Sequence, residues 1–473
     1  MGSVRLIPQF ETWPSIKHFV GSLGGRITVF LLFFLLYSFL QSDSYLSSLF
    51  INSSPLEISF LLDYSKVALV VGLAVCSFSG SYRPLSVFIV TFLLILLQQS
   101  WPYIFIYIII LEITLLLSFV ILKFQKSFIS RRPLQTLIGF YFFCVVMTGF
   151  LKTGTYFEES IWSFNNIFVT YIWFVAYALL SLKQNNPVSP IINLGSLRPL
   201  WGGSNTPFGK NWSYLQRFES KDSEDLAITH IKGLKLLIWI LLVRESLFLY
   251  NQVLCAEFQI PTYYDVFSML LKGISFPWYL GWISLFRDFF GGILWMVVWG
   301  GTFVVCARMA GFRLLRNTVN PLGAKSIADF WNRYYYYFKE LLVDFFFYPS
   351  ISRYFKKLPK MRIFFATFMA AGFGNFLYHF LRDINLVHNQ GWVSTIWGFR
   401  TYSIYCLILG LGIGFSQLQQ PSKFGPKKNF FMQGFSLIRI ILFYCIIQIF
   451  DLDDGNDGEF FNRFIFLGKL FGL

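Results

Sequence analysis

Charged side chains are scarce in this chain, because Asp, Glu, Lys and Arg together make up only 13% of its 473 residues. Hydrophobic residues reach 55%, Phe alone occurs 59 times, and the mean hydropathy is +0.57. A water-soluble globule cannot bury so much apolar surface, so lipid must cover a large part of it. We therefore expect residues 1–473 to form one all-α, polytopic bundle of transmembrane helices.

Several common site motifs are absent as well. The sequence has no HExxH, no GxxxxGK[ST], no CxxC and no cluster of His and Cys, so it predicts neither a metal site nor a bound nucleotide. It has no GxSxG elbow, so a covalent acyl-enzyme intermediate is not required. The six Cys stand singly and are expected to be small buried hydrophobes. Met1–Gly25 lacks the short apolar core of a signal peptide.

The formal net charge is +15, but the basic residues form short clusters between apolar runs. This pattern indicates membrane topology rather than nucleic-acid binding. Alternation of Lys and Arg between loops predicts a cytoplasmic N-terminus, a cytoplasmic loop at Lys183–Lys232 and an external acidic tail at Asp451–Glu459. Four aromatic residues of the long loop are expected to anchor it at the lipid interface, namely Trp201, Phe208, Trp212 and Tyr214.

A helix needs about 20 apolar residues to cross a bilayer, and tilt and neighbours relax this length. The apolar segments that approach it are Ile27–Leu40, Val67–Phe78, Leu85–Leu97, Tyr103–Leu122, Leu134–Leu151, Ile161–Leu182, Leu234–Leu254, Val266–Leu285, Phe290–Cys306, Ile363–Phe380, Val393–Phe415 and Phe431–Phe450.

The positions of Lys and Arg assign each loop to the inside or the outside of the membrane. The assignments made from the N-terminus and from the C-terminus disagree by one membrane crossing between residues 234 and 308. One segment there should fail to cross, and two Gly-Gly pairs favour Phe290–Cys306, since each Gly costs a helix about 1 kcal/mol relative to Ala. We therefore expect a re-entrant or broken helix within Phe290–Ile327. Such backbone is tolerated where it lines a cavity, so this expectation includes a central tunnel beside His379.

Histidine is rare, and the four positions are His18, His230, His379 and His388. His379 is expected to be the only one inside a span, where an ionisable side chain is costly unless it has a partner or a function. One reading is a structural histidine that is hydrogen-bonded to a neighbouring helix. The other is a general base that takes the proton from a hydroxyl as this attacks a carbonyl carbon.

A polar and aromatic segment, Ser326–Pro349, precedes His379. If this segment is helical, Asp329 and Arg333 are four residues apart and can pair on one face. The run Tyr334–Tyr337 also fits an interfacial amphipathic helix. Asn332 has two readings, because it can donate a hydrogen bond to developing negative charge or simply bond a neighbouring helix.

The last third of the chain carries a fixed order of elements: Asp329-Phe330-Trp331-x-Arg333, then Asp344 to Tyr348-Pro349, then His379, then Trp397-Gly398-Phe399-Arg400. This order resembles the membrane-bound O-acyltransferase family, whose bacterial members include alginate acetylases and D-alanyl transferases of teichoic acid. Its signature region corresponds to residues 307–380. Two positions depart from the bacterial pattern: Tyr335 stands where a histidine is usual, and His379 lacks the usual preceding Trp and following Gly.

The resemblance implies an O-acyltransferase of the bacterial cytoplasmic membrane, which moves an acyl group from a thioester donor to a hydroxyl of an envelope glycan, a lipid or a small molecule. It implies no bound cofactor. The donor would be acyl-CoA or the phosphopantetheine of an acyl carrier protein, membrane lipids would be further partners, and nucleic acid would not. Catalysis is assigned to His379 as general base with Asn332, and substrate binding to Asp329, Trp331, Arg333, Tyr335 and Asp344.

A second reading is a transporter or flippase of lipid-linked saccharides. Such a protein uses charges inside the membrane for ion coupling, and Glu112, Arg244 and Asp288 lie in or near expected spans. These charges are scattered, however, and no Gly- or Pro-broken segments recur at matching positions in two halves. Transport would move a substrate without any covalent change, which separates the two readings.

Overall fold

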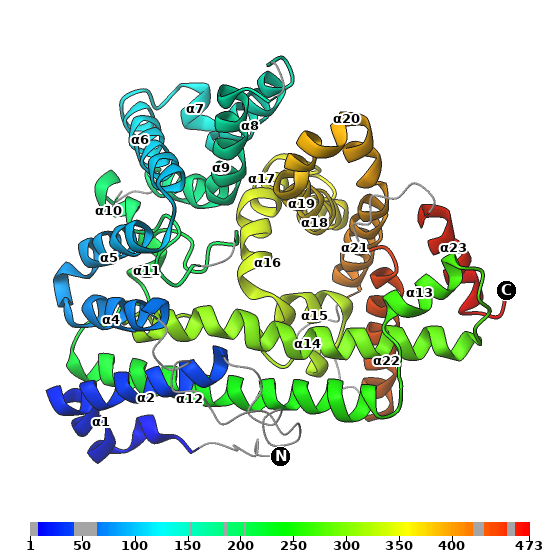
Figure 1. Ribbon diagram of the computed structural model, residues 1–473, viewed down its shortest axis with the longest axis horizontal. Coiled ribbons are helices and arrows are strands. Elements are labelled where there is room, and N and C mark those ends of the chain that lie inside the picture. The colour runs from blue at the N-terminus through cyan, green and yellow to red at the C-terminus, as the bar shows by residue number, and fades with distance from the viewer. Residues whose placement is uncertain are drawn as a thin grey trace. The chain divides into compact units, whose positions relative to one another are not determined.

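The computed structural model describes residues 8–41, 64–151, 154–183, 188–202, 205–419, 430–451 and 459–473. These residues form helices, together with one isolated antiparallel bridge between Glu219 and Phe312 (Figure 1). The predicted all-α class is confirmed. In this described part, eight helices are long and apolar enough to cross a membrane, so the chain is a multi-pass integral membrane protein by the length and composition of its helices.

The described chain divides into two compact units. Unit 1 comprises Met1–Glu245 and Val298–Arg316, and unit 2 comprises Ser246–Val297 and Asn317–Leu473. Two long helices, α12 (Ser223–Leu249) and α14 (Trp278–Met309), contribute residues to both units.

Proline marks the start of several helices in unit 1. Five of its helices have Pro at their first or second position, where the missing N–H costs nothing. The pairs α4 with α5, α6 with α9, and α8 with α9 pack against each other. Besides parts of α12 and α14, the helices are α1 (Pro14–Gly21), α2 (Leu23–Gln41), α4 (Tyr64–Phe78), α5 (Arg83–Gln98), α6 (Trp101–Lys123), α7 (Phe128–Arg131), α8 (Pro133–Thr148), α9 (Tyr156–Ser181), α10 (Pro190–Leu194) and α11 (Trp212–Leu215).

The loop expected at Lys183–Lys232 is packed into unit 1 over much of its described length. Trp201, Phe208 and Trp212 are 2%, 1% and 0% exposed, so the expectation that they anchor at the lipid interface is wrong. The Trp201 and Trp212 rings contact Phe312 at centroid distances of 5.2 and 5.7 Å. Large aromatic side chains bury much apolar surface when they pack in a protein interior, and these three form part of the core of unit 1.

Unit 2 is centred on α21, which packs against α15, α18, α19 and α22. Its N-terminal helix α13 starts with a capping box, in which Thr262 and Asp265 exchange side-chain to backbone hydrogen bonds. Besides parts of α12 and α14, the helices are α13 (Tyr263–Leu271), α15 (Ile327–Tyr334), α16 (Tyr336–Leu342), α17 (Tyr348–Arg353), α18 (Pro359–Phe368), α19 (Asn375–Asp383), α20 (Val387–Gly398), α21 (Arg400–Leu418), α22 (Phe430–Gln448) and α23 (Glu459–Lys469).

The expected break in Phe290–Cys306 is wrong, because this segment lies within α14, which is continuous from Trp278 to Met309. Its glycines allow close packing instead. A Cβ added to Gly301 would lie 2.7 Å from the Ile240 Cδ1 atom, so the absence of a side chain lets the two helices approach.

A helix interruption does occur in this region, at another place. Val266–Leu285, expected as one span, is divided between α13 and the start of α14, with residues 272–277 between them. The nine residues of α13 rise about 14 Å, roughly half of the hydrocarbon thickness of about 30 Å. Between residues 234 and 308, the described helices that are long and apolar enough to cross a membrane are α12 and α14. The other expected segments overlap either candidate spans or the shorter helices Tyr64–Phe78, Pro133–Thr148 and Gly434–Gln448.

A buried guanidinium organises one end of unit 1. Arg83 is 3% exposed, and its Nη1 donates to the Glu219 carboxylate and to the Ser220 carbonyl, both at 3.0 Å. Its Nε and Nη2 donate to the carbonyls of Cys76 at 3.2 Å and Ser77 at 3.3 Å. Burial raises the pKa of Glu219, and the neighbouring guanidinium opposes that shift. Arg83 thus joins the end of α4 to the segment before α12.

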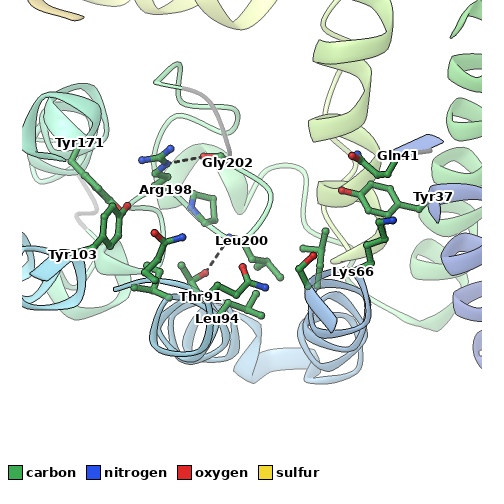
Figure 2. Close-up of a pocket in the computed structure, with 16 residues that line it drawn as sticks. Tyr37, Gln41, Lys66, Thr91, Leu94, Tyr103, Tyr171, Arg198, Leu200 and Gly202 are labelled. Carbon is green, nitrogen blue, oxygen red and sulfur yellow. Dashed lines mark hydrogen bonds between the residues drawn. The ribbon is translucent and has the colours of Figure 1, made fainter. Parts of the chain in front are cut away.

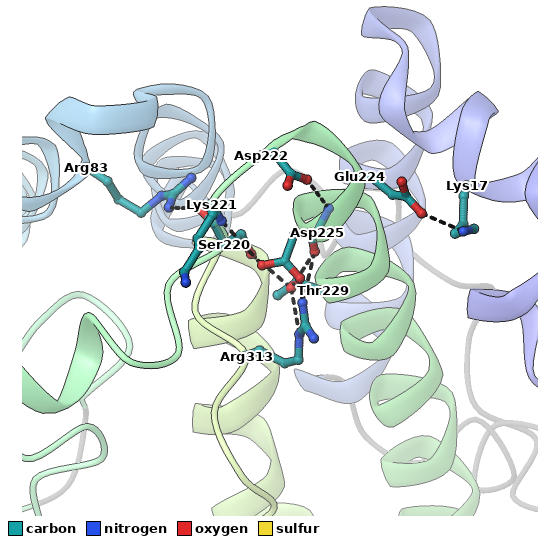
Figure 3. Close-up of polar contacts among 9 residues, drawn as sticks. All are labelled: Lys17, Arg83, Ser220, Lys221, Asp222, Glu224, Asp225, Thr229 and Arg313. Atoms are coloured by element: carbon teal, nitrogen blue, oxygen red, sulfur yellow. Dashed lines mark hydrogen bonds and ion pairs between the residues drawn. The ribbon is translucent and has the colours of Figure 1, made fainter.

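The same segment is held to α12 by further polar contacts (Figure 3). The Ser220 hydroxyl donates to the Thr229 Oγ1 at 2.9 Å, and the Arg313 Nε donates to the same oxygen at 3.2 Å. Arg313 also forms an ion pair with Asp225. These contacts connect two stretches of unit 1 that lie far apart in the sequence, the start of α12 with the segment before it and the segment around Arg313.

We expect Arg83→Ala to destabilise the protein by about 1–3 kcal/mol, since the change removes this donor from a half-buried carboxylate and from three backbone carbonyls. The measurement is the thermal midpoint of detergent-purified protein. Arg131→Ala is the matched control, because Arg131 is exposed. Equal midpoints for the two variants would contradict the organising role of Arg83.

Candidate functional site

Helix α15 lies within the expected signature region, residues 307–380, and Ser326 caps its N-terminus. The Ser326 hydroxyl accepts a hydrogen bond from the Asp329 N–H at 3.1 Å. The Asp329 carboxylate accepts from the Arg333 Nε at 2.8 Å and from the Lys325 N–H at 2.9 Å. The predicted pairing of Asp329 with Arg333 is therefore confirmed. A partly exposed pair four residues apart is worth only about 0.3–0.5 kcal/mol, so it mainly fixes local geometry.

The other polar and aromatic residues of α15 point in two directions. Trp331 and Tyr334 are half-buried and line a cavity, whereas Asn332 between them is exposed and is not part of that wall. The Tyr334 hydroxyl donates to the Gly292 carbonyl at 3.4 Å. Burial raises the pKa of this phenol well above its ordinary value, so the hydroxyl keeps its proton and remains a donor.

The cavity beside α15 has a volume of about 130 Å³ and lies wholly within unit 2. Its polar lining comes from Asp288, Asp451 and Gln448, and the Gln448 Oε1 is buried without a hydrogen bond to the described residues. Engineered cavities of about 150 Å³ hold one benzene molecule, so this space can take the end of a substrate but not a whole glycan or coenzyme. The aromatic rings in its wall are Phe289, Phe330, Trp331, Tyr334, Tyr405 and Tyr444.

His379 lies on α19, directly after a π-helical segment at Met369–Gly374. Its ring is half-buried, and its Nδ1 is buried without a hydrogen bond to the described residues. Three rings surround it, at centroid distances of 4.7 Å for Tyr402, 5.3 Å for Tyr378 and 6.0 Å for Phe338. Single π-helical turns are frequent at functional sites, which makes this imidazole a candidate for chemistry.

Two pairs of aromatic contacts join His379 to the wall of the cavity. Tyr402 stacks on Tyr405 with a centroid distance of 5.2 Å, and Phe338 contacts Trp331 at 6.3 Å. Both Tyr405 and Trp331 line the cavity. The histidine is therefore one aromatic layer away from the cavity, and the two belong to one site within unit 2.

The remaining predicted binding residues lie near this site but outside the cavity wall. Tyr335 connects α15 to α16, is half-buried, and contacts Phe338 at a centroid distance of 5.3 Å. Asp344 is half-buried in a second π-helical segment, Val343–Phe347. Of the predicted binding residues, the structure thus brings Trp331 to the cavity, while the Asp329 pair supports the helix that carries it.

The expectation that His379 is the only histidine inside a span is wrong. His230 lies on α12 within the candidate span Ser223–Val253. It is 0% exposed, its Nε2 is 3.0 Å from the Ser77 Oγ, and Phe30 packs edge-on at 5.4 Å. This closed setting is typical of a structural histidine, whereas the ring of His379 is half-buried.

Most residues of the cavity wall carry no motif in the sequence, and neither does Tyr402 beside them. Tyr402 and Tyr405 are three residues apart, and this helical spacing was a usable signal that both face the same side. Tyr444 and Gln448 are four residues apart in the same way, but no motif marked them. Their position beside α15 follows from the packing of α22 and required the structure.

Among the described residues, no group of three or more His, Cys, Asp or Glu side chains could hold a metal ion. No protein-family model and no curated protein sequence matches this chain.

The helix that carries His379 is positioned by a close contact between α21 and the π-helical segment Met369–Gly374. A Cβ added to Gly410 would lie 2.9 Å from the Gly372 Cα atom, which is backbone and cannot move aside cheaply. Small residues permit such close approach between membrane helices.

We expect Gly410→Ala to lower the stability of the protein by about 1–3 kcal/mol, because the added methyl group overpacks this contact. The thermal midpoint in detergent checks it. Gly139→Ala serves as the control, since a Cβ there has no atom within 4 Å. If Gly410→Ala left the midpoint as high as the control does, the contact would not be as tight as described.

Proposed function

We propose that this protein is a membrane O-acyltransferase of the bacterial cytoplasmic membrane, with its N-terminus in the cytoplasm. It would transfer an acyl group from a thioester donor to a hydroxyl of an envelope glycan, a lipid or a small molecule. The observation that carries the proposal is His379, a half-buried imidazole in a candidate span. It lies one aromatic layer from the cavity beside α15.

In the proposed reaction the imidazole of His379 accepts the proton of the acceptor hydroxyl. The hydroxyl oxygen forms a bond with the thioester carbonyl carbon, the C–S bond breaks, and the thiol leaves with the proton that the imidazole returns. A general base contributes about 10²- to 10⁴-fold to such a step. The aromatic rings around His379 limit water there, which disfavours hydrolysis of the donor.

The cavity fits a neutral part of the acceptor better than the anionic part of the donor, while the reacting hydroxyl would lie at His379, on the other side of the aromatic layer. Asp288 and Asp451 line it, and both would repel the phosphates of CoA or phosphopantetheine. Residues 353–360 are exposed and rich in Lys and Arg, and they precede the helical segment that carries His379. With the proposed topology this stretch faces the cytoplasm, where its positive charge would attract such a donor. Arg362 and His379 are about 25 Å apart along this helical segment at 1.5 Å per residue, so donor and acceptor would meet through a tunnel.

Asn332 has a different proposed role from that of a cavity residue. Its side chain is exposed on α15, so it would orient the part of the acceptor that remains outside the cavity. Trp331 would pack against the end that enters. Tyr335 and Asp344 would hold α16 and its π-helical extension in place around Phe338, which contacts His379.

We expect His379→Gln to lose at least about 100-fold in acyl transfer while the protein still folds and inserts, because general-base loss costs about 10²- to 10⁴-fold. The measurement is mass spectrometry of alkali-labile esters in envelope glycans and lipids. Cells that lack the protein are compared with cells that carry the wild type or the variant.

His388→Gln is the matched control, because His388 belongs to the same unit and is exposed. Thermal midpoints of both purified variants verify folding. Full restoration of the ester by His379→Gln would remove this residue from the mechanism. Absence of any ester difference between cells with and without the wild type would argue against acyl transfer.

The cavity itself can be tested by filling it. A Cβ on Gly292 would meet only the Tyr334 hydroxyl, at 3.9 Å, so Gly292→Ala should fold normally and keep its activity. Gly292→Leu would occupy the cavity, and we expect it to reduce ester formation at least about tenfold with an unchanged thermal midpoint. Equal ester levels for the two variants would show that the substrate does not enter this cavity.

A further inference from the structure

One carboxylate lies at the centre of a very hydrophobic helix. The mean hydropathy of α6 reaches 2.8, the highest of the eight candidate spans in the described residues. Glu112 is its central residue, eleven residues from Trp101 and eleven from Lys123. At 1.5 Å per residue it lies about 16 Å from each end of the helix, close to the middle of the membrane. A charged side chain at that depth is rare and costly, and it almost always has a partner.

Glu112 lies on the outer face of α6. It is exposed and makes no hydrogen bond or ion pair with the described residues. Phe105 and Phe119, seven residues away on either side, are exposed on the same stripe of the helix. The opposite face is occupied, because Tyr103 lines a cavity of about 390 Å³ within unit 1, and its hydroxyl is 2.9 Å from that of Tyr171 on α9 (Figure 2). The carboxylate therefore faces the surroundings of the protein.

A guanidinium lies at the centre of another helix, in unit 2. Arg439 is the central residue of α22, nine residues from Phe430 and nine from Gln448, and it is the only charged residue of that helix. Its side chain is exposed, as are those of Phe435 and Ile438 next to it. It makes no hydrogen bond or ion pair with the described residues. Two helices thus carry opposite charges at the same depth, each on an exposed face.

Neither charge reaches water by itself. The hydrocarbon core is about 30 Å thick, so each side chain starts roughly 15 Å from either interface, which is further than a glutamate or an arginine extends. Protonation neutralises a carboxylate, but a guanidinium does not lose its proton in proteins. Arg439 therefore needs an anion at its own depth, and Glu112 provides one. Because both groups already lie in the membrane, pairing them carries no new cost of removing charges from water.

We infer that two copies of this chain associate in the membrane, with Glu112 of each copy paired with Arg439 of the other. A twofold dimer is the smallest closed assembly of this kind, and it leaves neither charge unpaired in either copy. The exposed apolar side chains beside the charges pack around the two pairs, namely Phe105 and Phe119 on α6 and Phe435 and Ile438 on α22. This inference concerns assembly and does not depend on the proposed acyl transfer.

Disulfide cross-linking in membranes tests the contact. Two differently tagged proteins are produced together, one with Glu112→Cys and the other with Arg439→Cys. Both also carry Cys144→Ala, because the other five native Cys are buried. We expect a cross-linked pair of the two tags, since the second ion pair of the dimer stays intact. Val71→Cys in place of Glu112→Cys is the matched control, because Val71 is exposed at the centre of α4 and is uncharged. No link, or an equal link with the control, would overturn the inference.

Dissociation of the dimer in lipid vesicles, measured by Förster transfer between labelled copies, tests the role of charge. We expect Glu112→Gln or Arg439→Gln to raise the dissociation constant at least about tenfold. Glu112→Arg and Arg439→Glu in one chain should restore it, because both pairs form again with their signs exchanged. Lys126→Gln is the control, since Lys126 is exposed beyond the end of α6. A monomeric wild type, or an unchanged constant in either folded neutral variant, would overturn the inference.

Discussion

Polar backbone groups among membrane helices need partners within the protein, and this constraint shapes both units. In unit 1 the Arg83 guanidinium donates hydrogen bonds to three backbone carbonyls. The Thr91 hydroxyl accepts a hydrogen bond from the Leu200 N–H, which belongs to an irregular segment. In unit 2 irregularity takes the form of π-helical segments, such as Met369–Gly374 before His379. The irregular segment held by Thr91 lines a cavity, and the π-helical segment Met369–Gly374 directly precedes the helix of a candidate catalytic side chain.

The comparison of His230 with His379 explains why position within a span does not by itself identify a catalytic residue. Both imidazoles lie in candidate spans. His230 is sealed between Ser77 and Phe30, while His379 keeps a half-buried ring framed by aromatic side chains that extend to a cavity. Accessibility and neighbours, rather than membrane depth, separate a structural histidine from a candidate base.

Composition and hydropathy predicted the all-α membrane class, and the spacing of Asp329 and Arg333 predicted their ion pair. The expected helix break in Phe290–Cys306 was wrong, because Gly-Gly pairs were taken as helix breaks. In α14 they are contact points such as Gly301 against Ile240, and the interruption falls in residues 272–277 instead. The cavity wall could not be predicted, since Tyr405 and Tyr444 come together through the packing of α21 and α22 and not through any local pattern.

The central claim is that a covalent acyl transfer takes place in unit 2, at His379 and the cavity beside α15. Its most direct measurement uses the protein reconstituted into proteoliposomes made with envelope lipids and glycans, supplied with a thioester donor whose acyl group carries ¹³C. The account predicts labelled ester on an acceptor, with thiol released in equal amount. Movement of a saccharide across the bilayer with no labelled ester and no released thiol would contradict it.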